Sequence, residues 1–283
     1  MLTARDAGIG LWKVQKKFFG QHLGRWLFYQ DRVGAHGESL PARRLNRVNQ
    51  WITERGVTAP WVMTRSECQA YWRTRTNGAE YATTDSNHPA SYGAKSQDIV
   101  RFLHEFWGPH VTRHDRILEL GCNCGANLNG LLTLGYERLN GVEINAHAVA
   151  YMPSIFPEVS AVSTITVGSV EDVLPGLESG SADVIFTMAV LIHVHPNSRA
   201  IFRHMVRVAR KYVCVVELEA ANCGYVFARD YRRVFEGLGC TEVASVAITG
   251  EAFPQSLGEY HGYTARLLAV PRPKLDRPRG DRA

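Results

Sequence analysis

From residue 116 onward, short apolar runs alternate with segments of helical pattern, and no other feature constrains the fold as strongly. Such alternation is typical of βαβ units, whose parallel strands are joined by helices that cross over the sheet. The runs that we interpret as strands are 116–120, 138–144, 163–169, 182–189, 211–219, 241–249 and 264–270. Helices are expected after Gly125, around Ala146–Phe156, around Ser198–Arg210 and around Arg229–Leu238.

The last two runs are joined by residues 250–263, a segment too short and too rich in Gly and Pro for a crossover helix. We therefore expect these two strands to pair antiparallel, because a short connection permits only that arrangement. The predicted fold class is α/β. It consists of a Rossmann-like, mostly parallel sheet with a terminal antiparallel hairpin and a helical N-terminal extension.

The chain before the sheet has a different character. Residues 96–107 (SQDIVRFLHEFW) predict a helix with Ser96 as its N-cap. Its buried face is expected to consist of Ile99, Val100, Leu103 and Phe106. The predicted segments of the whole chain are a basic, aromatic, helical extension at 1–65, a helical cap or lid at 66–112, the α/β domain at 113–271 and a disordered tail at 272–283.

Basic residues are concentrated at the N-terminus. Residues 1–50 hold nine Lys/Arg against three Asp/Glu, whereas the formal net charge of the whole chain is +5. Such a segment could meet nucleic acid, an anionic membrane surface or an acidic partner, although a solvated helix face explains it more simply.

Composition and cysteine spacing exclude several classes of protein. A hydrophobic content of 45% is ordinary for a globular protein with a real core, and no apolar run is long enough to span a bilayer. The first residues lack the apolar stretch of a signal peptide. The six cysteines follow no disulfide-scaffold spacing, so we expect reduced thiols and a cytoplasmic protein.

The strongest local signal is a glycine-rich turn, 119–127 (ELGCNCGAN), which follows the first predicted strand and opens a helix. Glycines there let the backbone turn sharply and approach a ligand, and the helix N-terminus offers free N–H groups. A dinucleotide site requires glycine at the middle position for the pyrophosphate, whereas this chain has Asn123. Glu119 could instead pair with the ammonium of an amino-acid-bearing cofactor.

A second acidic residue, Glu143, ends the next strand about 20 residues after the turn, the separation expected for a carboxylate that binds ribose hydroxyls. The alternative is that this residue only caps a helix. Ser169 and Val170 end the third strand and could line an adenine pocket, although nothing in that stretch is specific.

On these motifs the chain resembles the class I S-adenosylmethionine (SAM)-dependent methyltransferases over about residues 91–270. The stretches ELGCNCGANLNGL, GVEIN, VLIHVHP and RKYVCVVELEAAN are most similar to bacterial methyltransferases associated with pseudaminic acid and surface-polysaccharide biosynthesis. One departure is Ser169, where many members carry Asp; Glu171 or Asp172 could substitute for it. The resemblance implies a SAM site formed by Glu119, Gly121, Cys122, Asn123, Gly125, Asn127, Glu143, Ile144, Ser169, Val170, Met188 and Ala189.

The segment after the fourth strand is expected to border the methyl acceptor. Methyl transfer requires a nucleophile in line with the sulfonium methyl and, for a hydroxyl acceptor, a base. His193 is our first candidate base and His195 the second, because histidine accepts protons near neutral pH. Each could instead only hydrogen-bond the loop. Glu217 could orient the acceptor or a histidine, or be a solvated carboxylate at a strand end.

Aromatic residues on both sides of the sheet segment are candidates for a lid or substrate wall, with ordinary packing as the alternative. They are Tyr71, Trp72, Tyr92, Tyr260 and His261. The His193–His195 pair has no clear third ligand, and Cys122 and Cys124 have no partner pair at zinc spacing, so we expect no metal.

The predicted function is transfer of a methyl group from SAM to a small molecule such as a sugar, a sugar nucleotide or a specialised metabolite, with O-methylation favoured. A nucleic-acid methyltransferase is an alternative, but the fourth strand lacks the Asn/Asp-Pro-Pro-aromatic element that holds a flipped base. A non-catalytic subunit of the same fold and an NAD-dependent oxidoreductase are further alternatives. A homodimer and a membrane-surface contact of the N-terminus stay open.

Overall fold

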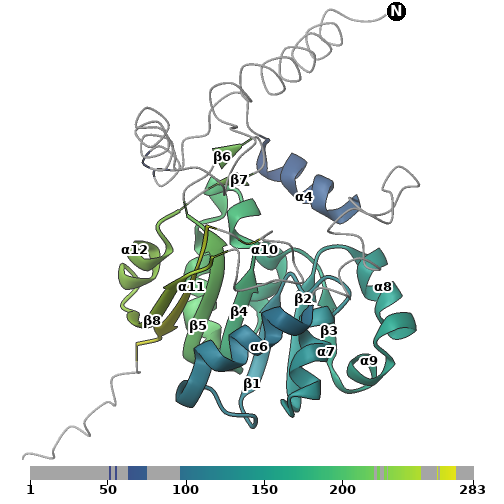
Figure 1. Ribbon diagram of the computed structural model, residues 1–283. Coiled ribbons are helices and arrows are strands. Elements are labelled where there is room, and N and C mark those ends of the chain that lie inside the picture. Colours follow the sequence, from purple (N-terminus) through teal and green to yellow (C-terminus); the bar gives the residue numbers. More distant parts are fainter. Residues whose placement is uncertain are drawn as a thin grey trace, which may run out of the picture.

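The computed structural model describes residues 51, 55, 63–74, 96–219, 222–223, 226–227, 229–249, 260 and 262–271. Seven strands form one sheet in the order β3-β2-β1-β4-β5-β9-β8 (Figure 1). They are β1 (Arg116–Leu120), β2 (Arg138–Glu143), β3 (Thr164–Val167), β4 (Ala182–Met188), β5 (Ala209–Leu218), β8 (Thr241–Ala247) and β9 (Tyr263–Ala269). Two shorter strands, β6 (Asn222–Cys223) and β7 (Val226–Phe227), form a separate hairpin.

Strands β1 to β5 are parallel, and β9 is antiparallel to both β5 and β8. The predicted α/β class and the antiparallel pairing of the last two strands are therefore confirmed. The last strand, β9, lies between β5 and β8. The second strand of the terminal hairpin therefore pairs with β5, and the first strand, β8, forms the edge of the sheet.

Helices cover both faces of the sheet. They are α4 (Arg65–Thr74), α6 (Ser96–Trp107), α7 (Ala126–Thr133), α8 (Ala146–Ile155), α9 (Pro157–Val162), α10 (Val170–Val173), α11 (Ala200–Val208) and α12 (Tyr231–Glu236). Turns of 3-10 helix are η2 (Gly108–His110), η3 (Leu174–Gly176), η4 (Leu191–His193) and η5 (Pro196–Ser198). Of the described helices, none is long and apolar enough to cross a membrane.

Two apolar clusters sandwich the sheet because successive side chains of a strand point to opposite faces. In β4, Phe186 packs with α6 and α7, while Ile185 packs with α11 and α12. All seven residues of β4 are buried, as expected for a central parallel strand. The sequence pattern alone misassigned one position of α6: Trp107 is fully buried, and Phe106 is only partly buried.

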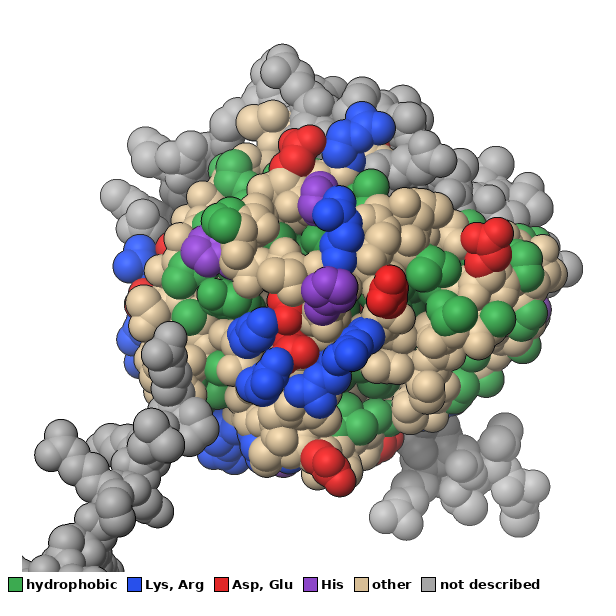
Figure 2. Space-filling view, turned by 90° about the horizontal axis from the view of Figure 1, so that it is seen from below, with side chains coloured by type: hydrophobic (Ala, Val, Ile, Leu, Met, Phe, Trp, Pro, Cys, Tyr) green, Lys and Arg blue, Asp and Glu red, His purple; other side chains and the backbone are tan. Residues whose placement is uncertain are grey.

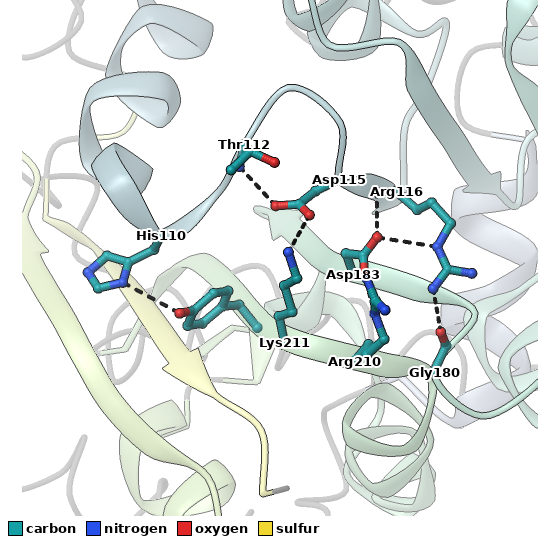
Figure 3. Close-up of polar contacts among 9 residues, drawn as sticks. His110, Thr112, Asp115, Arg116, Gly180, Asp183, Arg210 and Lys211 are labelled. Atoms are coloured by element: carbon teal, nitrogen blue, oxygen red, sulfur yellow. Dashed lines mark hydrogen bonds and ion pairs between the residues drawn. The ribbon is translucent and has the colours of Figure 1, made fainter.

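Ion pairs join the strands at their amino ends (Figure 3). The carboxylate of Asp183, at the start of β4, accepts from the backbone N–H of Arg116 at 2.9 Å and from the guanidinium groups of Arg116 and Arg210. The Nζ of Lys211 lies 2.5 Å from the buried carboxylate of Asp115. Figure 2 shows this face, with Lys and Arg side chains gathered around carboxylates. The candidate site lies at the opposite edge of the sheet, where the parallel strands have their carboxyl ends.

Candidate functional site

The site lies at the carboxyl ends of β1 to β4. Strands β2 and β3 lie on one side of β1, and β4 and β5 lie on the other, so the order in which the chain adds parallel strands to the sheet reverses between β1 and β4. In open α/β sheets, ligands bind in the crevice that such a reversal leaves beyond the strand ends. Most residues predicted to bind the cofactor are located along this crevice.

The glycine-rich turn is bent tightly and approaches the loop after β4. Gly121 has φ +75°, and a Cβ atom there would lie 2.4 Å from Cγ2 of Val190. Gly125 has φ +80° and begins α7. Asn123 also has positive φ, 49°, a conformation that Asn tolerates better than most residues. The positive φ values and the close approach to Val190 explain why the turn contains glycine.

Glu119 and Asn127 form a buried polar pair beneath this turn. Nδ2 of Asn127 donates to Oε1 of Glu119 at 2.8 Å. Neither Oε2 of Glu119 nor Oδ1 of Asn127 has a hydrogen-bond partner in the described part of the chain. Burial raises the pKa of Glu119 to about 8, although the bond from Asn127 lowers it. Two unsatisfied acceptors in a buried place suit a cationic donor such as an ammonium group.

Glu143 supports the turn from the end of β2. Its Oε2 accepts from the backbone N–H of Asn123, and its Oε1 accepts from that of Asn145, both at 2.8 Å. Burial raises the pKa of this carboxyl, while these backbone N–H groups lower it. The next residue but one, Asn145, caps α8, so β2, the turn and α8 are held together at Glu143. Ile144, between them, is half-buried.

Ser169 caps α10 at the end of β3. Its hydroxyl donates to Asp172 at 2.6 Å and accepts from Nε2 of Gln69 in α4 at 3.4 Å. Val170 beside it is buried. Glu171 accepts from the hydroxyl of Ser198 at 3.0 Å. The two acids considered as substitutes for the missing Asp are therefore already engaged with serines.

The loop after β4 is shaped by Glu217, which is fully buried in β5. Its two oxygens accept from the hydroxyl of Thr187 at 2.8 Å and from three backbone N–H groups, those of Val190, Leu191 and Ile192, at 3.0–3.2 Å. Burial raises the pKa of Glu217 to about 7, and these hydrogen bonds lower it. The carboxyl is not a solvated group at a strand end. It holds the turn that carries His193.

Met188 is buried at the end of β4, and Ala189 follows with a positive φ of 55°. The backbone N–H of Ala189 donates to the carbonyl of Val216 at 3.0 Å, which keeps the chain beside β5 through this strained residue. The strain lies where the resemblance places the cofactor.

The two histidines of the loop have different surroundings. The half-buried ring of His193 lies against the indole of Trp72 in α4, with 4.3 Å between ring centroids. His195 is buried, and its Nδ1 accepts from the backbone N–H of Asn197 at 3.1 Å. Burial and the charge of Arg229 lower the pKa of His195. His193 therefore lies at the lid helix, whereas His195 caps a turn of the loop.

Helix α4 lies over the carboxyl edge of the sheet (Figure 1). It contacts the edge through Gln69 and Trp72, and Tyr71 meets Trp72 edge-on at 5.1 Å. Cys68 is its only buried residue. The predicted lid residues Tyr71 and Trp72 are thus brought to the site.

The remaining predicted substrate residues are Tyr260, Tyr92 and His261. Tyr260 is buried in the core against Tyr263, with ring centroids 5.4 Å apart. Tyr92 and His261 lie outside the described residues.

Cys122 and Cys124 are buried thiols within the turn; burial raises the pKa of Cys124 to about 12 and raises the pKa of Cys122 well above the ordinary value of a thiol. The five cysteines with described side chains are all free. No group of three His, Cys, Asp or Glu that could hold a metal occurs among the residues that the structure describes.

Arg229 is a site residue that the sequence analysis missed. Its buried guanidinium donates to the carbonyls of Leu191 at 2.7 Å, Phe227 at 3.1 Å and Val194 at 2.5 Å. No sequence signal marks this arginine, because an exposed side chain is the ordinary expectation for arginine.

Comparisons with known proteins bear on the fold of the chain. Residues 118–214 match a family described as a methyltransferase domain. The fold is that of SAM-dependent methyltransferases. No curated protein matches the chain.

Solved structures similar to this one include several enzymes. Magnesium protoporphyrin IX methyltransferase from Synechocystis PCC 6803 with bound S-adenosylhomocysteine (SAH) is 14% identical, with a TM-score of 0.53 over 74% of this chain and 100% of that one. Geranyl diphosphate C-methyltransferase from Streptomyces coelicolor A3(2) is 13% identical, with a TM-score of 0.50 over 75% of this chain and 98% of that one. The cyclase SpnF is 13% identical, with a TM-score of 0.54 over 75% of this chain and 98% of that one. These likenesses establish the fold, and the cyclase shows that the fold alone does not determine the reaction.

Proposed function

We propose that this chain binds SAM at the carboxyl edge of its sheet and transfers the methyl group to a small-molecule acceptor. The observation that carries the proposal is the buried Glu119–Asn127 pair, whose two free acceptor oxygens lie beneath a glycine turn. Unsatisfied buried acceptors are costly, so their retention at a crevice indicates that a donor occupies the place in the functional state.

The residues present fit the cofactor. Glu119 and Asn127 would hold the ammonium of its methionine portion, and Glu143 would accept from the ribose hydroxyls while holding the turn. Ile144, Ser169 and Val170 would border the adenine, and Met188 and Ala189 would border the sulfonium. When bound, SAM supplies an electrophilic methyl group. The chain's own part is to orient the acceptor, to exclude water and to remove a proton.

His193 is the residue proposed to accept that proton through a ring nitrogen. It lies on the loop after β4, and the indole of Trp72 shields one side of its ring. His195 is less suited, because its Nδ1 already accepts a backbone hydrogen bond and burial lowers its pKa. A histidine base favours a hydroxyl acceptor, because a hydroxyl group must lose its proton as it attacks the methyl group.

The acceptor class belongs to the same proposal. Sugars and sugar nucleotides are the first acceptors to screen, because the chain's motifs resemble those of methyltransferases of surface-polysaccharide biosynthesis. The nucleic-acid alternative depends on the basic segment 1–50, which lies outside the described residues.

Binding calorimetry with SAM and SAH tests the cofactor, with NAD as the negative ligand. Both SAM ligands should bind and NAD should not. Glu143→Ala should weaken SAH binding roughly 10- to 100-fold, the effect of losing hydrogen bonds to a charged group. Glu178→Ala, which changes an exposed carboxylate remote from the crevice, should leave binding unchanged. Folded protein that binds neither SAM nor SAH would overturn the proposal.

A further inference from the structure

The turn η4, which carries His193, forms hydrogen bonds with two buried charged side chains, Glu217 and Arg229, on its two sides. Leu191 shows this directly, because its N–H donates to Glu217 at 3.0 Å and its carbonyl accepts from Arg229 at 2.7 Å. Glu217 binds the amino side of the turn, and Arg229 binds its carbonyl side through Leu191 and Val194.

Arg229 is 3% exposed and makes no ion pair with a carboxylate in the described part of the chain. Its hydrogen bonds go to main-chain carbonyls. Burial lowers the pKa of the Arg229 guanidinium, and Tyr231 and then Glu217, on the far side of the turn, favour its charged form. The peptide groups of the turn therefore lie between the Arg229 guanidinium and the Glu217 carboxyl, and both side chains hydrogen-bond to them.

We propose that Arg229 is a positioning residue that, with Glu217, fixes η4 so that the ring of His193 stays against Trp72 and faces the acceptor. The inference rests on the proposed function for the role of His193. It assigns to Arg229 the orientation of the base and no contact with the reacting atoms.

The same guanidinium also donates to the carbonyl of Phe227 in β7. Arg229 consequently joins the β6–β7 hairpin to the loop after β4, and a displacement of the hairpin would be transmitted to His193. The orientation of His193 thus depends on the β6–β7 hairpin, which follows β5, as well as on β4, which precedes His193.

Lysine is a discriminating replacement. An ammonium keeps the charge, but it is a compact point donor, whereas the planar fork of arginine presents donors in fixed directions to Leu191 and Val194 at once. Arg229→Lys should therefore preserve the charge balance with Glu217 and release one side of the turn.

The test is proton NMR of the histidine rings in the full chain. The His193 resonance is assigned by its loss in His193→Asn, and its displacement by the Trp72 ring current is defined by Trp72→Leu, which has no aromatic ring. In Arg229→Lys the His193 signal should move toward its position in Trp72→Leu, while the signal of His104 in α6 stays in place.

Arg207→Lys is the matched control. Arg207 also donates to main-chain carbonyls, those of Leu174, Pro175 and Leu177, but it does so at the opposite edge of the sheet. This variant should leave the His193 signal unchanged. An unchanged His193 signal in folded Arg229→Lys, or an equal shift in Arg207→Lys, would refute the positioning role.

Glu217→Gln carries the test if Arg229→Lys does not fold. An amide retains one acceptor but turns an N–H₂ group toward a backbone N–H, so the His193 signal should shift in the same direction; no shift in the folded variant would count against the proposal. SAH calorimetry on the wild type is read separately. Absence of SAH binding defeats the proposed function, whereas the NMR result alone decides whether Arg229 positions His193.

Discussion

At the scale of single residues, three buried glutamates differ in how many hydrogen-bond donors the protein supplies to them. Glu143 accepts two backbone N–H groups, and Glu217 accepts three together with a hydroxyl, so both organise loops. Glu119 has one side-chain donor and one oxygen without a partner. Because the protein supplies the fewest donors to Glu119, this carboxylate is the one that we propose for the cofactor's ammonium.

Cofactor binding should therefore be coupled to the protonation of Glu119. Its pKa is raised to about 8 in the unliganded protein, chiefly by burial, so the carboxyl is largely neutral at pH 6. A bound ammonium favours the carboxylate and lowers that pKa, so binding releases a proton. SAM affinity should accordingly rise between pH 6 and pH 8, by at most about tenfold per pH unit, and level off above pH 8.

Calorimetry at several pH values and in buffers of different ionisation enthalpy measures this coupling. Glu119→Gln should bind SAM more weakly at pH 8, and its binding of SAM should release fewer protons than binding to the wild type does. A pH dependence that is identical in the wild type and in Glu119→Gln would show that Glu119 does not contact the cofactor's cation.

At the scale of elements, local signals predicted what local forces determine. The glycine turn was identifiable because positive φ and a helix N-terminus depend on neighbouring residues. Strand β4 was identifiable because its sequence is mostly apolar. Burial of Arg229 and Glu217 could not be predicted, since a charged residue is buried only where distant backbone groups satisfy it. The choice of Trp107 over Phe106 likewise depends on how α6 meets the sheet.

The glycine turn gives a prediction at this scale. Gly121→Ala and Gly125→Ala both place a side chain at positive φ, which costs roughly 1–2 kcal/mol each. The new Cβ at position 121 meets the branched side chain of Val190 at 2.4 Å, whereas that at position 125 meets the flexible end of Met152 at 2.6 Å. Gly121→Ala should therefore destabilise the protein more.

Urea unfolding of both variants measures this difference. The pair Gly121→Ala with Val190→Ala should recover part of the lost stability, because the second change removes the clashing methyl groups. Equal losses for the two glycine variants, with no recovery in the pair, would contradict the close approach of the turn and the loop after β4.

At the scale of the whole molecule, the two edges of the sheet have separate tasks. The carboxyl edge holds residues with positive φ and buried acceptors without a partner, both of which cost stability, and helix α4 lies over it. The amino edge holds satisfied ion pairs that tie β1, β4 and β5 together (Figure 3). The sequence indicated the first edge through its motifs. It gave no indication of the second, because the pairing of Asp183 with Arg116 spans 67 residues.

This division predicts that stability and cofactor binding can be changed independently. Asp183 is buried and accepts three hydrogen bonds, from the Arg116 N–H and from both guanidinium groups. Asp183→Asn would turn an amide N–H₂ group toward these donors, at a cost of about 1–3 kcal/mol of the free energy of unfolding. SAH affinity should not change, since no residue of the crevice contacts Asp183. Glu137→Gln, an exposed acid at the same edge, should change neither quantity.

Acid unfolding provides the complementary measurement. Burial alone would raise the pKa of Asp183, but its hydrogen bonds to Arg116 and Arg210 outweigh it and lower the pKa below 3.8. The stabilisation from this group is therefore present above pH 3.8 and is lost as the pH falls through the folded-state pKa. Asp183→Asn should abolish that part of the acid-induced loss, so its stability deficit should shrink in acid. If folded Asp183→Asn instead lost SAH affinity, the two edges would be energetically coupled, and the separation of stability from binding would be wrong.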